Sequence, residues 1–105
     1  MREGEIVTVF RSRLREEDND DYETWAAEMH GLATAMPGFL EIKSFTADDG
    51  ERVSIVRFED EATQKAWREH PRHRLAQQAG RDRFYSAYSI EVCRCLSARA
   101  FERAD

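Results

Sequence analysis

The clearest pattern near the start of the chain is an alternation of side chains from Glu5 to Leu14. One set of alternate positions carries Ile6 and Phe10, and the other set carries Val7 and Val9. A period of two with β-branched and aromatic residues predicts a strand. Stretches of similar character predict three further strands, over residues 39–46, 52–58 and 85–96.

A turn signal, Asp48-Asp49-Gly50, separates the second and third predicted strands and favours an antiparallel hairpin. Between the first and second strands the apolar spacing changes to three and four. This spacing predicts an amphipathic helix that begins after the acidic run 18–21, where several residues could serve as N-caps. Its apolar face consists of Tyr22, Trp25, Ala26, Met29, Leu32, Ala33 and Met36. The dipeptide Pro37-Gly38 ends this helix.

The stretch between the third and last strands predicts a helix that is broken at a proline. Asp60 is placed to cap a short helix that runs through Trp67. Pro71 disfavours helical geometry at His70 and suits the first position of a second helix. We expect that second helix to end at Gly80.

The order strand, helix, strand, strand, broken helix, strand is the split βαβ pattern of ferredoxin-like α+β domains. It predicts a four-stranded antiparallel sheet with helices on one face. A chain of 105 residues is long enough for one hydrophobic core. We therefore expect a single domain over residues 1–105, with a core from about 5 to 96 and a tail from 97 to 105.

Both faces of the predicted sheet carry apolar side chains. In the first strand, Ile6 and Phe10 oppose Val7 and Val9, and Ile55 opposes its apolar neighbours in the third strand. One layer of helices covers only one face. The simplest cover for the other face is a second copy of the sheet, packed about 10 Å away. We predict a homodimer through the sheet faces, with a tail that frays or lies across the partner subunit.

Charge and composition narrow the choice of partners. A net charge of -5 and a pI near 5.2 argue against nucleic acid, because phosphate binding needs a basic face. No signal sequence stands in residues 1–20, and no apolar run approaches the roughly 20 residues that cross a bilayer. We expect a cytoplasmic protein with no membrane partner. Cys93 and Cys95 lie two apart in a predicted strand, where a disulfide would be strained, so we interpret them as reduced residues.

Four landmarks in this order resemble the antibiotic biosynthesis monooxygenase (ABM) family of small dimeric ferredoxin-like proteins. They are Met36-Pro37-Gly38-Phe39, Phe58-Glu59-Asp60-Glu61-Ala62, Trp67 followed by His70-Pro71-Arg72-His73, and the stretch from Tyr85 to Tyr88. The resemblance runs from about Ile6 to Leu96 and implies a dimeric α+β barrel.

The family includes oxygenases that act on quinols and aromatic polyketides without metal or flavin, a haem-degrading branch, and members with no known activity. The resemblance implies a monooxygenase without a cofactor, acting on a small phenolic, quinol or polyketide-like aromatic substrate. The alternatives are a non-catalytic aromatic-ligand-binding or stress-associated dimer, and a haem-binding or haem-degrading member. The haem-degrading branch has an asparagine in the first strand and a histidine ten residues after the tryptophan, where this chain has Phe10 and Gln77.

The window from Trp67 to His73 holds an indole and two imidazoles and is the candidate catalytic site. Oxygenation without a cofactor needs a base that removes a phenolic proton in a dry pocket. His73 suits this role because the positive end of the helix that starts at Pro71 favours a neutral imidazole. The alternative is a histidine that caps or packs at the helix start. We expect no metal site, because Pro71 breaks the helical face between His70 and His73.

Further residues complete the predicted pocket. Trp67 is either an aromatic wall for the substrate or a core residue. Tyr85 is preferred to Tyr88 as a site residue, because the two lie on different faces of a regular strand. The remaining pocket candidates are Trp25, Met29, His70 and Gln77. Ordinary core packing is the alternative for the two residues of the first helix.

Overall fold

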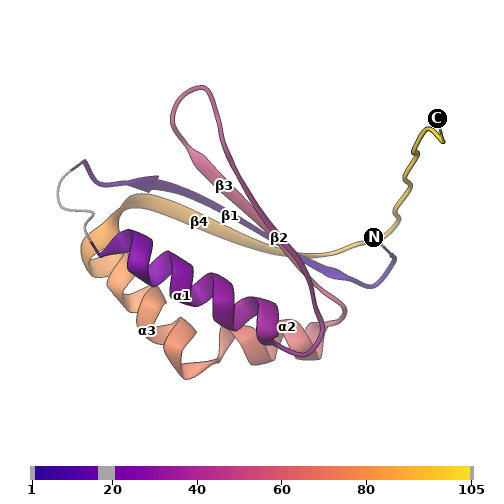
Figure 1. Cartoon of the computed structure of the whole chain (residues 1–105), viewed down its shortest axis with the longest axis horizontal. Helices are drawn as coiled ribbons and strands as arrows, with labels where there is room; N and C mark the ends of the chain where they lie inside the picture. Colours follow the sequence, from indigo (N-terminus) through magenta and orange to yellow (C-terminus); the bar gives the residue numbers. More distant parts are fainter. Residues whose placement is uncertain (1, 17–20, 105) are drawn as a thin grey trace.

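The structure, a computed structural model, describes residues 2–16 and 21–104 (Figure 1). The elements in chain order are β1 (Ile6–Leu14), α1 (Tyr22–Ala35), β2 (Phe39–Thr46), β3 (Arg52–Phe58), α2 (Glu61–Arg68), α3 (Pro71–Ala79), the π-helical turn η1 (Gly80–Phe84) and β4 (Tyr85–Arg94). The helices lie together on one side of the sheet (Figure 1). This arrangement confirms the predicted ferredoxin-like α+β architecture.

The sheet has the strand order β2-β3-β1-β4, and every neighbouring pair is antiparallel. In the register of the central strands, Ile6 lies opposite Phe58, and both side chains are buried beneath the helices. This set of alternate positions defines the helix-side face. The next positions, including Val7 opposite Arg57 and Cys93, define the open face, which carries no helix.

Local signals placed the β2–β3 hairpin and the start of α2 correctly. Both hairpin strands begin and end at the predicted residues. Asp60 caps α2: its side chain accepts a hydrogen bond from the Thr63 backbone N–H at 2.8 Å, and the Thr63 hydroxyl accepts one from the Asp60 N–H at 3.4 Å. The predicted caps of α1 at residues 18–20 lie outside the described residues. Asp21 precedes α1 without a side-chain capping bond.

The helical chain does not stop at Gly80, contrary to our prediction. The π-helical turn η1 follows α3 directly, and Gly80 has a φ of -60°, so it is not a left-handed cap. The reason for a glycine is packing instead. A Cβ at this position would lie 2.6 Å from the ring of Tyr85, which is closer than a real contact allows.

The core joins α1, α2 and β3. Its buried members are Phe58, Ala33 and Trp67, with exposed fractions of 0%, 1% and 7%. Met29, Leu32, Met36, Phe39 and Val56 are partly buried against them. Gly38, with a φ of 81°, lets the turn after α1 pass close to Thr63, where a Cβ would lie 2.5 Å from that side chain. The turn therefore fixes the start of β2 against the capping residues of α2.

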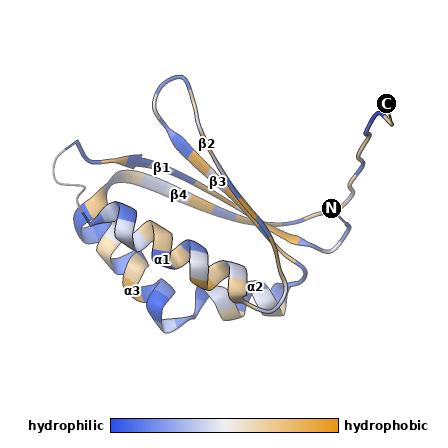
Figure 2. Cartoon of the chain, viewed as in Figure 1, coloured by the Kyte–Doolittle hydropathy of each residue, from blue (hydrophilic) through white to orange (hydrophobic). Residues whose placement is uncertain are grey.

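The open face is apolar at its centre, as predicted. Val7, Val9, Val53 and Ile55 are half-buried by their neighbours in the sheet. Phe45 on the same face is 49% exposed. Hydrophobic positions recur along the strands as well as along the helical layer (Figure 2). An apolar sheet surface without a helical cover is the feature from which we predicted a partner.

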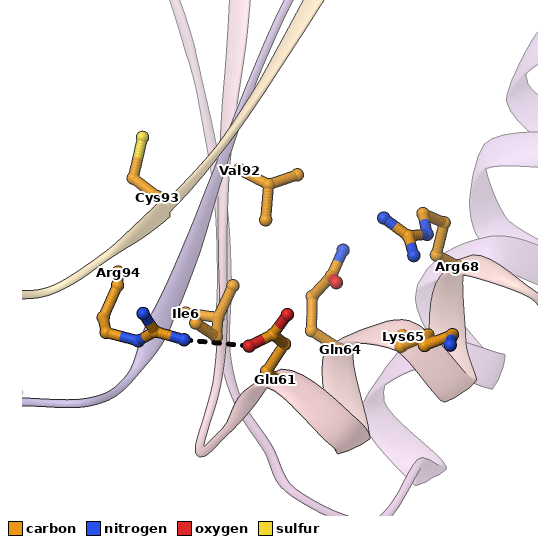
Figure 3. Close-up of a pocket in the computed structure, with 8 residues that line it drawn as sticks. All are labelled: Ile6, Glu61, Gln64, Lys65, Arg68, Val92, Cys93 and Arg94. Atoms are coloured by element: carbon orange, nitrogen blue, oxygen red, sulfur yellow. Dashed lines mark hydrogen bonds and ion pairs between the residues drawn. The ribbon is translucent and has the colours of Figure 1, made fainter.

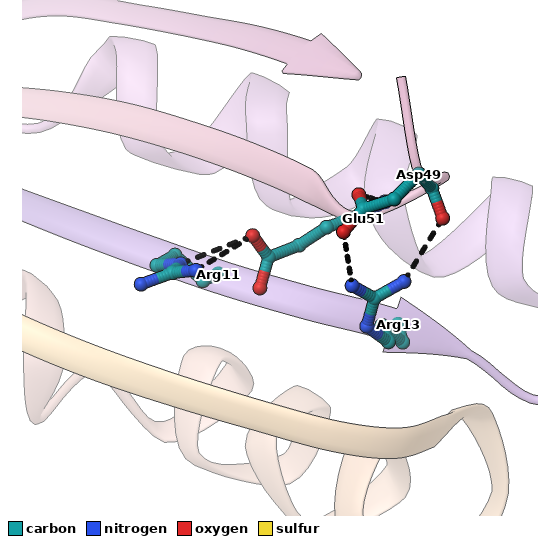
Figure 4. Close-up of polar contacts among 4 residues, drawn as sticks. All are labelled: Arg11, Arg13, Asp49 and Glu51. Carbon is teal, nitrogen blue, oxygen red and sulfur yellow. Dashed lines mark hydrogen bonds and ion pairs between the residues drawn. The ribbon is translucent and has the colours of Figure 1, made fainter. Parts of the chain in front are cut away.

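Ion pairs on the open face hold the tip of the β2–β3 hairpin to β1 (Figure 4). Arg11 donates two hydrogen bonds to one carboxylate oxygen of Glu51, at 2.9 and 3.1 Å. Arg13 binds the carboxylate of Asp49 at 2.8 Å and its backbone carbonyl at 3.1 Å. The Glu51 backbone N–H and, second, the Arg13 guanidinium lower the pKa of Asp49 below its ordinary value.

After Arg94, residues 95–104 form neither helix nor strand, so β4 is two residues shorter than predicted. Leu96 and Phe101 in this stretch are 82% and 83% exposed. Cys93 and Cys95 are both free. None of the helices in the described ranges combines the length and the apolar character that a bilayer crossing requires.

Candidate functional site

The junction of α2 and α3 is built around His70 and Pro71. Pro71 occupies the start of α3, and His70 is the N-cap, with its Nδ1 accepting a hydrogen bond from the Arg72 backbone N–H at 3.1 Å. His70 thus belongs to the start of the second helix as well as to the end of the first. The chain turns here, so that His73 in the first turn of α3 returns to the side of Trp67.

Trp67 and His73 form a stacked pair. Their ring centroids are 4.0 Å apart and the planes are inclined by 12°. Trp67 is 7% exposed and packs in the core with Phe58 and Ala33. Trp67 was predicted to be either a wall for the substrate or a core residue. In the structure it is a core residue, and the imidazole of His73 stacks on its ring.

The hydrogen bond of His73 defines its tautomer. Nδ1 lies 3.0 Å from the carbonyl oxygen of Trp67, and since a carbonyl can only accept, Nδ1 carries the proton. Nε2 of the neutral ring is then an acceptor. Burial lowers the pKa of His73 below its ordinary value, the Trp67 carbonyl raises it, and the nearby His70 lowers it. The direction agrees with our prediction of a neutral imidazole, although burial is the main cause.

Tyr85 and Tyr88 lie on the same side of β4, so the prediction that they face opposite ways is wrong. Ser86 is an extra residue in the pairing of β4 with β1, and this bulge reverses the alternation beside Tyr85. The two phenol rings are 5.9 Å apart, and both approach Phe10, at 5.5 and 5.7 Å. The last strand therefore presents two tyrosines to the helix-side face.

Tyr85 is a protonated phenol at neutral pH. Burial is the main effect that raises its pKa far above the ordinary value; the Tyr22 hydroxyl raises it further, and Arg52 lowers it. Its ring contacts are with Phe10, Tyr22 and Tyr88, whereas those of His73 are with the α2–α3 junction. Tyr85 and His73 therefore belong to two separate aromatic groups.

The other predicted pocket residues are dispersed. Met29 packs against the core cluster. Trp25 lies at the contact of α1 with α3, where the guanidinium of Arg72 sits 5.3 Å from its ring centroid and forms a bidentate ion pair with Glu28, at 2.7 and 2.8 Å. Gln77 is half-buried on α3. Trp25 lines a shallow depression with Arg72, and Met29 does not.

The helix-side face of β4 is left partly open, which the sequence did not lead us to expect. Tyr88, Ile90 and Val92 lie on the same side of the sheet as Ile6 and Phe10, yet they are 39%, 47% and 46% exposed. Within the described ranges α1 packs mainly against β2 and α2 against β3, and these three side chains of the edge strand stay partly exposed. The result is an apolar wall, formed by these three residues, inside the angle between helices and sheet.

A cavity of about 250 Å³ lies at the Val92 end of this wall, between α2 and β4 (Figure 3). Ile6 and Val92 are its apolar residues, and α2 contributes Gln64 and Arg68. Gln64 is 6% exposed. Sequence reasoning missed this site, although a signal existed: Gln64 stands three residues before Trp67, on the buried side of an amphipathic helix, where an apolar residue is the norm.

The fold and these local motifs agree with a direct family match. The chain belongs to the antibiotic biosynthesis monooxygenase family, whose sequence model matches residues 5–79.

Individual relatives extend over most of the chain. It is 29% identical over 100 residues to the uncharacterised protein YqjZ of Bacillus subtilis strain 168, which covers 95% of this chain and 88% of YqjZ. Among solved structures it is similar to SnoaB, a cofactor-independent oxygenase from Streptomyces nogalater, with a TM-score of 0.71, 18% identity, and 93% and 96% of the two chains covered. Protein SO0527 from Shewanella oneidensis has a TM-score of 0.78 at 12% identity, with 91% and 95% covered. At such identities the solved structures support the fold.

Proposed function

We propose that the chain is a cofactor-independent monooxygenase that acts on a small phenolic, quinol or polyketide-like aromatic substrate. The observation that carries the proposal is the state of His73: its Nδ1–H is bound to the Trp67 carbonyl, and burial keeps the ring neutral. A neutral imidazole with an unprotonated Nε2 can accept a phenolic proton. The similarity to SnoaB, a cofactor-independent oxygenase, supports the same reaction class.

The proposed reaction needs no external reductant. His73 takes the phenolic proton, and the electron-rich anion passes one electron to O₂, giving superoxide and a substrate radical. These combine in a C–O bond to form a peroxide. The carbon that carries the peroxide then loses its C–H proton while the O–O bond breaks. One oxygen stays on this carbon as a carbonyl, and the other leaves as water with the proton that His73 returns. The substrate supplies all four electrons that reduce O₂.

The apolar wall of Tyr88, Ile90 and Val92 is the proposed resting place of the aromatic rings, because it excludes water from one side of a planar ligand. Tyr85, protonated and near one end of this wall, is the proposed hydrogen-bond donor. The predicted roles of Trp67, Trp25, Met29, His70 and Gln77 in substrate contact stay predictions.

The test is oxygen uptake by metal-free protein with a panel of hydroquinones and anthrones. We expect uptake above the rate without protein, and a loss of about 100-fold or more in His73→Ala, in line with the contribution of a general base. The control is His30→Ala, since His30 is exposed on α1. Uptake that is absent, or equal in His73→Ala and the parent, would contradict the proposal.

A second candidate function is binding of an aromatic ligand without turnover. Two observations favour it: Trp67 is buried in the core, and Tyr85 and His73 lie in separate aromatic groups. Tight binding of an anthrone with no product detected by mass spectrometry would support this candidate over the oxygenase.

We also propose that the chain forms a homodimer in which the open faces of two sheets pack together. Support comes from the apolar centre of that face, where Val7, Val9 and Ile55 have no helical cover. The cytoplasmic location, the single domain of residues 1–105 and its division into core and tail stay predictions.

A further inference from the structure

We infer that the cavity between α2 and β4 binds the carboxylate of a small aromatic acid. The first observation is the state of Gln64. The residue is 6% exposed, and its side chain forms no hydrogen bond with any residue in the ranges 2–16 and 21–104. Figure 3 shows its amide directed toward the space beside Val92. The amide atoms of Gln64 are not among the fully buried side-chain atoms without a partner, so they face the space of the cavity, where a ligand can accept the amide N–H.

The second observation is the charge around the cavity. Arg68 forms no ion pair within the part of the chain that the structure describes, and Figure 3 shows its guanidinium directed toward Gln64. Arg94 is already bound to Glu61 at 2.8 Å. Lys65 adds a positive charge, although its side chain extends away along α2 (Figure 3). This concentration of cations occurs in a chain with a net charge of -5.

These groups select a carboxylate over other anions. A guanidinium presents parallel N–H groups that match the two oxygens of a carboxylate, and the Gln64 amide can donate to one of them. One uncompensated arginine matches a single negative charge. A dianionic phosphate would need a second unpaired cation, and Lys65 extends away from the cavity along α2 (Figure 3).

The apolar side of the cavity defines the rest of the ligand. Ile6 and Val92 line it, and Val92 continues into the exposed side chains of Ile90 and Tyr88. An acid held by Arg68 would lay a ring along this wall. If the proposed oxygenase activity is correct, its substrate is then an aromatic acid; this extension rests on the proposed function, whereas the binding site does not.

The experiment measures binding without turnover, by calorimetry with 1-naphthoate and its neutral counterpart 1-naphthamide. We expect 1-naphthoate to bind at least about tenfold more tightly than the amide, the size of a hydrogen bond to a charged group. Arg68→Gln should abolish this preference. Gln64→Leu should weaken binding of the acid while its melting temperature stays at or above that of the parent, because no internal hydrogen bond is lost.

The matched control is Arg74→Gln, which removes the same charge from an exposed position of α3 outside the cavity and should bind like the parent. Equal affinity for the acid and the amide, no binding of 1-naphthoate, or unchanged binding in Arg68→Gln would overturn the inference. The binding assay requires no oxygen chemistry, so the two proposals are tested separately. A failure of 1-naphthoate to bind would not contradict the oxygenase proposal, and an absence of oxygen uptake would not contradict this binding site.

Discussion

The imidazole of His73 stacks on the indole of Trp67 with centroids 4.0 Å apart, while its Nδ1 donates to the carbonyl of that same residue at 3.0 Å. One tryptophan therefore supports both the orientation and the tautomer of the histidine. The contact also buries the ring, and burial is the main reason that the pKa of His73 is lowered. Folding and the proposed chemistry are thus coupled at this pair.

The first prediction concerns stability at acid pH. The pKa of His73 is lowered in the folded chain, so below about pH 6.5 the unfolded chain binds a proton that the folded chain excludes. The free energy of unfolding should therefore fall as the pH drops below about 6.5. The fall should level off once the folded-state pKa has also been passed. Urea unfolding at a series of pH values between about 7.5 and 5 measures it.

His73→Gln provides the comparison, since it removes the titrating ring and keeps a donor for the Trp67 carbonyl. It should lose less stability than the parent over the same pH range. His30→Gln, at an exposed position of α1, is the matched control and should behave like the parent. A His73→Gln protein with the full pH dependence of the parent would show that other groups cause it.

The second prediction concerns the pH dependence of activity, which should reflect the lowered pKa of His73. If neutral His73 is the base, oxygen uptake should stay constant as the pH falls through the ordinary histidine range and decline with an apparent pKa below 6.5. The measurement is the pH profile of uptake with an anthrone, after subtraction of the rate without protein. An acid limb centred above 6.5 would exclude His73 as that base.

The third prediction concerns two glycines that differ in their surroundings. Gly80→Ala should lower the free energy of unfolding by about 1–3 kcal/mol, because its Cβ would lie 2.6 Å from the Tyr85 ring. Gly31→Ala is the opposite case: it lies within α1 with nothing within 4 Å, and should raise that free energy by about 0.5–1 kcal/mol. Chemical denaturation of both variants measures the difference. A Gly80→Ala protein that is as stable as the parent, or more stable, would refute the packing role of Gly80.

Features that depend on neighbouring residues were predictable from the sequence. The β2–β3 hairpin follows from its alternation and its turn, and Asp60 and Pro71 act at helix starts because capping and the proline ring are local effects. The amphipathic face of α1 and the two apolar sheet faces follow from periods of 3.6 and two. These local signals were sufficient for the fold.

Features that depend on contacts between distant residues were not predictable in the same way. The bulge at Ser86 changes the sheet face to which the side chain of Tyr85 points, and no residue type in the sequence predicts such an insertion. Gly80 looked like a helix end, although the reason for a glycine is the ring of Tyr85. The cavity at Gln64 requires that α2 and β4 meet, which only the tertiary structure shows.

The last prediction tests the proposed dimer through Ile55, a half-buried residue at the centre of the open face. The parent should sediment as a particle of twice 12.3 kDa at micromolar concentration. Ile55→Asp should raise the dissociation constant of the dimer by about 100-fold or more. Two-fold symmetry would bury two unpaired carboxylates in the interface, and each of them costs several kcal/mol.

The control is Leu75→Asp, at a position of α3 that is 52% exposed. It introduces the same charge outside the open face and should leave the dimer intact. Circular dichroism confirms that each variant is folded. A parent that sediments at 12.3 kDa, or an Ile55→Asp protein that stays dimeric, would show that the open faces do not pair.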